Sequence, residues 1–350
     1  MKSAGARDRR HEPARPSGIA SLGLPQSSQA TALHTKVAKI AKAESAGAVF
    51  LRPWRPSGKG LGVLFLFALV AALRAETLTV ATYNVENYGS ADRMTEAGYR
   101  KEYPKPETEK QALRAVIRGL DADILVLQEV GGQPYLDELR RDLKAEGLDY
   151  PQASLLEGND PDRHVAVLSR RPFKAVTPHA ALEFPYLGGT ERVKRGLLEI
   201  TVATPAGDLT LFGLHLKSRF TDRPDDPMSA VRRVGEATAI RDAVLARFPD
   251  PAAARFLVLG DCNDGKAGKA VQRLLRRGKT EVARLLPAAD ARGETWTHAY
   301  RKEETYSRVD HILVSPGLSA SVRGGVARIY GGAEATGASD HRPVVVTLEL

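Results

Sequence analysis

The chain has 350 residues, of which 43% are hydrophobic and 27% are charged, and it contains one cysteine, Cys262. These proportions are ordinary for a soluble globular protein and exclude a collagen-like repeat, wholesale disorder and a polytopic membrane protein. A single cysteine also excludes an intramolecular disulfide and a cysteine-based zinc site.

The formal net charge of +9 comes from the N-terminal region. Residues 1–75 hold 12 of the 51 Lys+Arg but only 3 of the 42 Asp+Glu, so residues 76–350 carry 39 of each. A positive charge spread over the whole molecule would favour polyanionic partners. Because the charge is confined to the first 75 residues, it does not by itself predict a nucleic-acid surface on the rest.

Residues 1–57 show no sustained apolar period, which predicts a disordered leader or a start assigned upstream of the true one. An apolar run at 61–73 follows, with basic residues before it and a small residue after it. This pattern is typical of a secretory signal peptide, which we place at 58–75. A membrane span would need about 20 apolar residues. A secreted or periplasmic protein is expected; a core helix, an uncleaved anchor and a transit peptide are the alternatives.

Residues 76–350 show no repeat and no long linker, so one domain is expected. Apolar, β-branched runs alternate with amphipathic stretches, which predicts an α/β protein whose helices cover its sheets. The predicted strands, in chain order, are 77–85, 124–128, 164–169, 196–202, 209–216, 256–259, 309–314 and 343–348. The predicted helices are 107–120, 134–146, 229–248 and 267–277.

Acidic, amide and histidine side chains stand at the ends of these predicted strands. They are Asn84, Glu86, Asn87, Glu129, His215, Asp261, Asn263, Asp264, Asp340 and His341. Strand ends at one edge of a sheet meet in a crevice, where α/β proteins place their chemistry. Carboxylate and amide oxygens without sulfur ligands suit a hard cation such as Mg²⁺ or Mn²⁺. Each residue alone could equally be a turn, cap or solvated loop residue, so the prediction depends on the whole set.

The motifs at 83–85 (YNV), 128–130 (QEV), 260–263 (GDCN), 309–311 (VDH) and 339–341 (SDH) resemble those of the endonuclease/exonuclease/phosphatase superfamily. The superfamily includes deoxyribonuclease I, abasic-site endonucleases, sphingomyelinases and inositol-polyphosphate phosphatases, and the resemblance covers about 78–349. It implies a four-layer α/β sandwich, with two mixed β-sheets packed face to face and helices on the outside. Cys262 departs from the usual aromatic residue, which we expect to change local packing and leave the flanking ligands intact.

The resemblance implies a metal site. Glu129 resembles the principal Mg²⁺ (or Mn²⁺) ligand, with Asn84 beside it, and Asp340 resembles a neighbouring acid that contributes to the same site. Two basic residues, Arg195 and Lys217, are candidates for adding positive potential beside a phosphate. Exposed basic residues on loops more often serve only to keep a protein soluble, so a solubilising role is the alternative to phosphate binding for both residues.

The resemblance also implies the catalytic set. His341 resembles the catalytic histidine and Asp310 the acid that orients it. Asp261 and Asn263 resemble the pair that faces the scissile phosphate. His215 matches the second histidine of the deoxyribonuclease and sphingomyelinase branches. Either His341 or Asp261 could deprotonate the attacking water, and the sequence leaves both open.

The leading hypothesis is therefore a monomeric secreted Mg²⁺- or Mn²⁺-dependent nuclease that hydrolyses DNA, with RNA as a second substrate. A phospholipid or sphingomyelin phosphodiesterase and a phosphomonoesterase are alternatives with the same chemistry. No hydrophobic hairpin is obvious in 76–350, so no stable membrane association is expected after processing. A non-catalytic binding scaffold is disfavoured because none of the motif residues is missing.

Overall fold

The computed structural model of the protein describes residues 76–95 and 97–350. The expected leader (1–57) and the expected signal peptide (58–75) lie outside the described residues. None of the helices in the described part combines the length and the apolar character needed to cross a bilayer.

Two mixed β-sheets form the centre of the described chain. The first has seven strands in the order β16 (Ala288–Ala289), β20 (Ala327–Ile329), β21 (Val344–Glu349), β1 (Thr77–Tyr88), β4 (Ile124–Val130), β6 (His164–Ser169) and β5 (Gln152–Leu156). The second has six, in the order β15 (Arg284–Leu285), β19 (Asp310–Val314), β12 (Phe256–Asp261), β11 (Gly207–His215), β10 (Leu197–Thr204) and β7 (Phe173–His179). Each sheet contains both parallel and antiparallel pairs.

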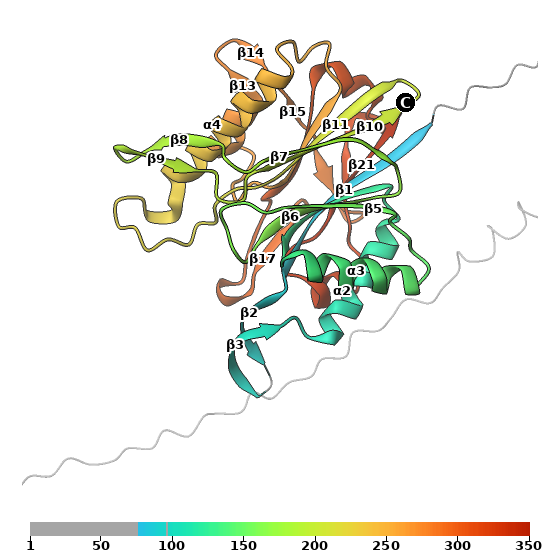
Figure 1. Cartoon of the computed structure of the whole chain (residues 1–350), viewed down its shortest axis with the longest axis vertical. Coiled ribbons are helices and arrows are strands. Elements are labelled where there is room, and N and C mark those ends of the chain that lie inside the picture. The colour runs from blue at the N-terminus through green and yellow to red at the C-terminus, as the bar shows by residue number, and fades with distance from the viewer. Residues whose placement is uncertain (1–75, 96) are drawn as a thin grey trace, which may run out of the picture. The chain divides into compact units, whose positions relative to one another are not determined.

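Helices cover the outer faces of both sheets, on opposite sides of the molecule (Figure 1). Side chains of α2 (Glu107–Leu120) and α3 (Gln133–Ala145) share one apolar cluster with the outer face of the seven-stranded sheet. Those of α4 (Ala230–Arg247) and α5 (Lys269–Leu275) share another with the six-stranded sheet. A third cluster, of aliphatic side chains from both sheets, fills the space between them. The expected four-layer sandwich is thus confirmed.

The pattern of strand β1 shows how the layers arise from the sequence. Successive side chains of a strand point to opposite faces. Leu78 and Val80 therefore enter the cluster between the sheets, while Ala81 and Tyr83 enter the cluster beneath α2 and α3. All four are buried, so both faces of the strand carry apolar side chains even though threonines interrupt the apolar sequence.

The predicted elements match the structure to within three residues at their ends, and several further elements had no prediction. A short helix, α6 (Ala335–Ala338), precedes the last strand. Four hairpins project from the sandwich: β2–β3 (Ser90–Thr95, Gly98–Pro104), β8–β9 (Glu183–Tyr186, Gly189–Arg192), β13–β14 (Arg276–Arg277, Thr280–Glu281) and β17–β18 (His298–Tyr300, Thr305–Ser307). The strands β5 and β7 at the sheet edges were also not predicted, because their residues are largely exposed or half-buried and lack a clear apolar period.

One glycine is required by the close approach of two central strands. Gly260 has a φ of 145°, and a Cβ there would lie 2.0 Å from the Leu214 carbonyl oxygen on β11. We expect Gly260→Ala to lower the free energy of unfolding by about 2 kcal/mol or more, because both the backbone and the neighbouring strand must shift. Gly265→Ala, where a Cβ meets nothing within 4 Å, is the control, expected to change stability by less than about 0.5 kcal/mol. Urea unfolding measures both; equal stabilities would contradict the prediction.

Candidate active site

The polar strand-end residues meet at one end of the sandwich. Strands β1 and β4 are parallel, so Asn84 and Glu129 end at the same edge of the seven-stranded sheet. Strands β11 and β12 are also parallel, and His215 lies directly beside Asp261 in their register. The antiparallel β19 begins at Asp310, opposite Asp261. The strand-end pattern predicted a single sheet edge, which is wrong, because the residues come from the ends of two facing sheets.

Glu129 is turned toward this end by an irregularity in its strand. At Glu129 the register of β4 shifts relative to both neighbouring strands, β1 and β6, and the φ of Glu129 is 64°. A bulge of this kind re-aims one side chain at the cost of a strained backbone, and such devices gather at functional sites. The Asn87 amide donates to Glu129 Oε2 at 3.1 Å, which fixes the carboxylate.

Asn84 joins the two sheets through its side-chain amide. Its Nδ2 donates to Glu129 Oε1 (3.2 Å) and to Asp261 Oδ2 (3.1 Å). Its Oδ1 accepts from the Glu86 amide (3.0 Å), and its carbonyl oxygen accepts from Ser339 Oγ (2.9 Å). One buried asparagine therefore sets the separation of two carboxylates that are 132 residues apart in sequence, and it orients the loop before the last strand.

His341 and Asp310 form a buried pair. His341 Nδ1 lies 2.8 Å from Asp310 Oδ2, while Nε2 is on the side of Asp340, 3.9 Å from Oδ1. Burial disfavours the imidazolium, but the charges of Asp310, Asp261 and Asp340 outweigh it and raise the pKa of His341 well above its usual value. The hydrogen bond to Asp310 fixes the ring orientation and leaves Nε2 for proton exchange.

Asp261 is held at the centre by Asn263. The Asn263 amide donates to Asp261 Oδ1 (2.7 Å), and Asn263 Nδ2 donates to Asp261 Oδ2 and to the Leu216 carbonyl, each at 3.0 Å. Burial, followed by the nearby charge of Asp310, raises the pKa of Asp261 to about 7. Carboxyl groups perturbed in this way are characteristic of catalytic clefts.

His215 is buried with no hydrogen-bond partner for either ring nitrogen in the described part of the chain. Its Nε2 lies 3.5 Å from Asp261 Oδ2 and 3.8 Å from Glu129 Oε1. Burial, together with the positive charges of Arg195 and His341, lowers the pKa of His215 well below its usual value. The ring is therefore a neutral group whose hydrogen-bonding capacity is available for a substrate oxygen.

The structure adds to the site one residue that the sequence did not predict, His298. It begins the β17–β18 hairpin, places Nε2 3.6 Å from Asp340 Oδ2, and packs against His341 with ring centroids 4.6 Å apart. The Asp340 amide in turn donates to Glu86 Oε2 (3.0 Å), so Glu86 also adjoins the site. No sequence signal marked His298, because the hairpin that carries it was not predicted.

The two basic candidates differ in their surroundings. Arg195 is buried, with Nε 2.8 Å from Asp160 Oδ2, whereas the ammonium of Lys217 contacts the carbonyl and hydroxyl oxygens of Ser218. Burial and the charges of Arg195 and Lys194 lower the pKa of Lys217 to about 8. Both residues stand near His215, but only Lys217 has a half-exposed side chain that a substrate can reach.

Other histidines of the described chain have structural environments. His164 lies 3.3 Å from the Leu156 carbonyl, His179 pairs with Glu199 at 2.9 Å, and His311 lies 2.9 Å from the Asp264 carbonyl. Cys262 is buried in the cluster beneath α4 and α5, and burial raises the pKa of its thiol. A buried thiol in this position fills apolar space.

The donor atoms of the site suit a hard divalent cation. Two groups bring three ligand atoms within 4.8 Å of one another: Asp261, Asp310 and His341, and His298, Asp340 and His341. Asp310 Oδ1 is buried without a hydrogen-bond partner in the described residues, and the carboxylates crowd one another, which a cation would relieve. Glu129 stands outside both groups and is linked through Asn84 to Asp261 of the first group.

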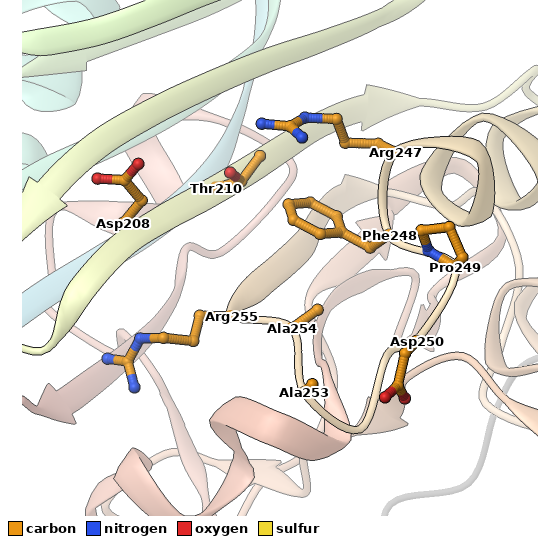
Figure 2. Close-up of a pocket in the computed structure, with 9 residues that line it drawn as sticks. All are labelled: Asp208, Thr210, Arg247, Phe248, Pro249, Asp250, Ala253, Ala254 and Arg255. Carbon is orange, nitrogen blue, oxygen red and sulfur yellow. The ribbon is translucent and has the colours of Figure 1, made fainter.

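A hollow of about 420 Å³ at the other end of the six-stranded sheet does not belong to this site. It is lined by Asp208 and Thr210, near the start of β11, and by residues between α4 and β12, including Phe248 and Arg255 (Figure 2). His215 and Asp261 lie at the far ends of these two strands.

The fold and this histidine- and carboxylate-lined end define the chain as an α/β-sandwich protein of the deoxyribonuclease I-like class. The model of the Endonuclease/Exonuclease/phosphatase family matches residues 81–341, and the chain belongs to this family, whose members are hydrolases that act on phosphoester bonds. A search of curated proteins finds no match.

Several solved structures share the fold at low sequence identity. Staphylococcus aureus beta toxin with bound magnesium ions is 16% identical (TM-score 0.55), covering 77% of this chain and 99% of its own. Sphingomyelinase C from Streptomyces griseocarneus is 18% identical (TM-score 0.54), covering 78% and 99%. Truncated TDP2 from Caenorhabditis elegans is 15% identical (TM-score 0.51), covering 80% and 100%. These are different proteins, so the likeness identifies the fold and not the substrate.

Proposed function

We propose that this protein is a Mg²⁺- or Mn²⁺-dependent phosphodiesterase that cleaves nucleic acid, with DNA as its principal substrate and RNA as a second one. The observation that carries the proposal is the buried His341–Asp310 pair, at 2.8 Å, facing a neutral, unpartnered His215 across Asp261. This arrangement provides groups for proton transfer and for hydrogen bonding within one cluster of side chains. A binding scaffold would not need these catalytic side chains, so their presence favours an enzyme.

Proton transfer is assigned to His341 and Asp261. Asp310 holds His341 through Nδ1, so Nε2 is the atom that exchanges a proton with water or with a phosphoryl oxygen. Asp261, whose pKa is raised to about 7, is the second group able to accept the proton of the attacking water. His215 Nε2 lies beside Asp261 and is placed to donate to the leaving oxygen.

A bound divalent cation supplies Lewis-acid stabilisation of the negative charge on the phosphate. Glu129 and Asp340 would hold it, with Asn84 beside them. The chain's own residues then orient the substrate: Asn84 keeps Glu129 and Asp261 at a set separation, and Asn263 braces Asp261. Lys217 adds positive charge next to His215.

A phospholipid or sphingomyelin phosphodiesterase is the second candidate function. The loop after β11 exposes Phe220 (83%) and Met228 (53%), an apolar feature that was not recognised in the sequence. Exposed side chains of this kind could enter a bilayer. The purified 76–350 chain, with Mg²⁺ or Mn²⁺, should hydrolyse plasmid DNA faster than sphingomyelin vesicles or phosphate monoesters. The reverse order would replace the nuclease proposal.

Export and a monomeric state are part of the same proposal. The apolar run at 61–73 supports cleavage near residue 75, which N-terminal sequencing of the protein from culture medium or periplasm would test. Light scattering on the processed protein would test the monomer.

A further prediction concerns His298 as a positioning residue. Removal of its imidazole frees the Asp340 carboxylate, so His298→Ala should raise the Mg²⁺ concentration for half-maximal activity about 10–100-fold. His298→Gln, which keeps a donor, should restore part of the loss. Thr305→Ala in the same hairpin is the control. An unchanged metal dependence with lowered thermal stability would show that His298 only supports the fold.

A further inference from the structure

A pocket of about 630 Å³ lies beside the catalytic end of the six-stranded sheet. It opens between the β8–β9 hairpin, the loop after β11 and the start of α4. We call it the lysine pocket. It is lined by Asn159, Glu183, Thr190, Glu191, Arg192, Lys194, Lys217, Asp222 and Arg232.

The two lysines of the pocket are held side by side by one buried carboxylate. Glu236 Oε1 accepts from the Lys194 amide (3.1 Å), and Oε2 accepts from the Lys217 amide (2.7 Å). Glu236 is fully buried on α4, so it ties the loop before β10 to the loop after β11. The backbone positions of both lysines at the pocket wall are therefore set by the fold.

Most of the other charges of the lysine pocket are already paired. Arg192 lies 3.2 Å from Glu183, and Arg232 lies 3.2 Å from Glu191. Asp222 is the one acidic lining residue with no ion pair among the described residues. These pairs leave Lys194, Lys217 and Asp222 to determine the charge of the pocket, which is positive by one unit because the lining has four basic and three acidic residues.

Neither lysine is neutralised by a carboxylate of its own. Lys194 lies 3.6 Å from Asp160, but Asp160 is bound more closely by Arg195, at 2.8 Å. In the described residues the ammonium of Lys217 has only oxygen atoms of Ser218 and the Phe220 carbonyl as partners. The wall next to the catalytic end thus carries an excess of positive charge, which suits an anionic group.

We propose that the lysine pocket binds a second phosphate group of a nucleic-acid strand whose scissile phosphate lies at His341. This inference rests on the proposed function and narrows its substrate class. Lys217 stands two residues after His215, so a strand that leaves the catalytic end along this edge passes the lysines next. A phosphodiester with one phosphate would leave the pocket empty.

The chemistry of the pocket argues against a choline headgroup. Quaternary ammonium groups are recognised by aromatic faces, and none of the nine lining residues is aromatic. Phe220 is exposed at a neighbouring position, where its carbonyl contacts Lys217. A base stacked on this ring would continue the same strand, since aromatic platforms beside basic grooves bind single strands.

The first test measures binding in EDTA, where no cleavage occurs. A fluorescein-labelled single-stranded DNA oligonucleotide is titrated with Lys194→Gln, Lys217→Gln and the control Lys279→Gln, an exposed lysine between β13 and β14. Each pocket variant should make the slope of log K against log[salt] shallower by about 0.7, as expected for one lost phosphate contact. The control should keep the wild-type slope. Unchanged slopes in folded pocket variants would overturn the proposal.

The second test separates this proposal from the proposed function. With Mg²⁺, the ratio of kcat/KM for the oligonucleotide to that for bis(p-nitrophenyl) phosphate should fall about tenfold in each pocket variant. Equal losses on both substrates would overturn the lysine pocket and leave the phosphodiesterase intact. A wild-type protein that cleaves neither substrate would overturn the function, while the binding slopes would still decide the pocket. Tighter binding to sphingomyelin vesicles than to DNA would assign the loop to a membrane instead.

Discussion

Replacing His341 with alanine is expected to lower kcat for phosphodiester hydrolysis about a thousandfold or more, within the range for loss of a positioned acid or base. Asp310 orients the ring through Nδ1. The variant removes this ring, and with it the Nε2 atom that exchanges protons. Steady-state hydrolysis of bis(p-nitrophenyl) phosphate measures the effect on chemistry without a contribution from DNA binding.

The controls for His341 separate chemistry from folding. Removal of the imidazole leaves Asp310 buried without its partner, which costs stability as well as activity. Thermal melting is therefore measured beside kcat, and Asp310→Asn, which keeps the shape of the pair, should also lose activity. His179→Gln, which alters a histidine paired with Glu199 on the edge strand β7, is the matched control. Full activity of a folded His341→Ala protein would refute the proposed mechanism.

Removal of divalent metal should have the second large effect. Excess EDTA is expected to abolish activity, and added Mg²⁺ or Mn²⁺ should restore it. Glu129→Gln keeps the size of the side chain but removes its charge, and we expect activity about a thousandfold lower at a fixed low Mg²⁺ concentration. That loss corresponds to several kcal/mol of charge stabilisation.

Glu157 provides the matched control for the metal site. It is an exposed glutamate on the loop after β5, and Glu157→Gln removes the same charge without a contact to the site. Isothermal titration with Mg²⁺ should show binding for wild type and for the control, and weakened binding for Glu129→Gln. Activity that persists in EDTA, or Mg²⁺ binding that is equal in all three proteins, would contradict the metal assignment.

The main helices and strands could be predicted from the sequence where the spacing of apolar residues and the signals at the ends of the element indicate the same structure. The helix predicted at 107–120 has the bounds of α2, because its apolar stripe faces the sheet and acidic residues occupy its first turn. The strand predicted at 164–169 matches β6, which is buried along its whole length. The hairpins were missed even though Gly188–Gly189 gives a turn signal between β8 and β9, because their strands are short and mostly exposed.

The site was predictable in its members and not in its contacts. Asn84, Glu129 and Asp261 could be named because each follows an apolar strand, and strand ends collect functional groups. That Asn84 bridges the other two is a property of two sheets facing each other, which no local pattern encodes. His298 was missed for the same reason: its neighbours Asp340 and His341 are more than forty residues away in the chain.

The sequence by itself determined the class of fold, the neutral charge of residues 76–350 and the residues able to carry phosphoester chemistry, because these depend on local period and residue type. Only the tertiary structure decided which groups meet at one end of the sandwich, how each lysine is paired and where a pocket opens. Glu236 shows the physical reason: it holds the Lys194 and Lys217 loops together through two backbone amides, and such a contact depends on packing between distant segments. The positive charge on which the proposed phosphate site depends is therefore local to Lys194 and Lys217, and is not the +9 of the whole chain.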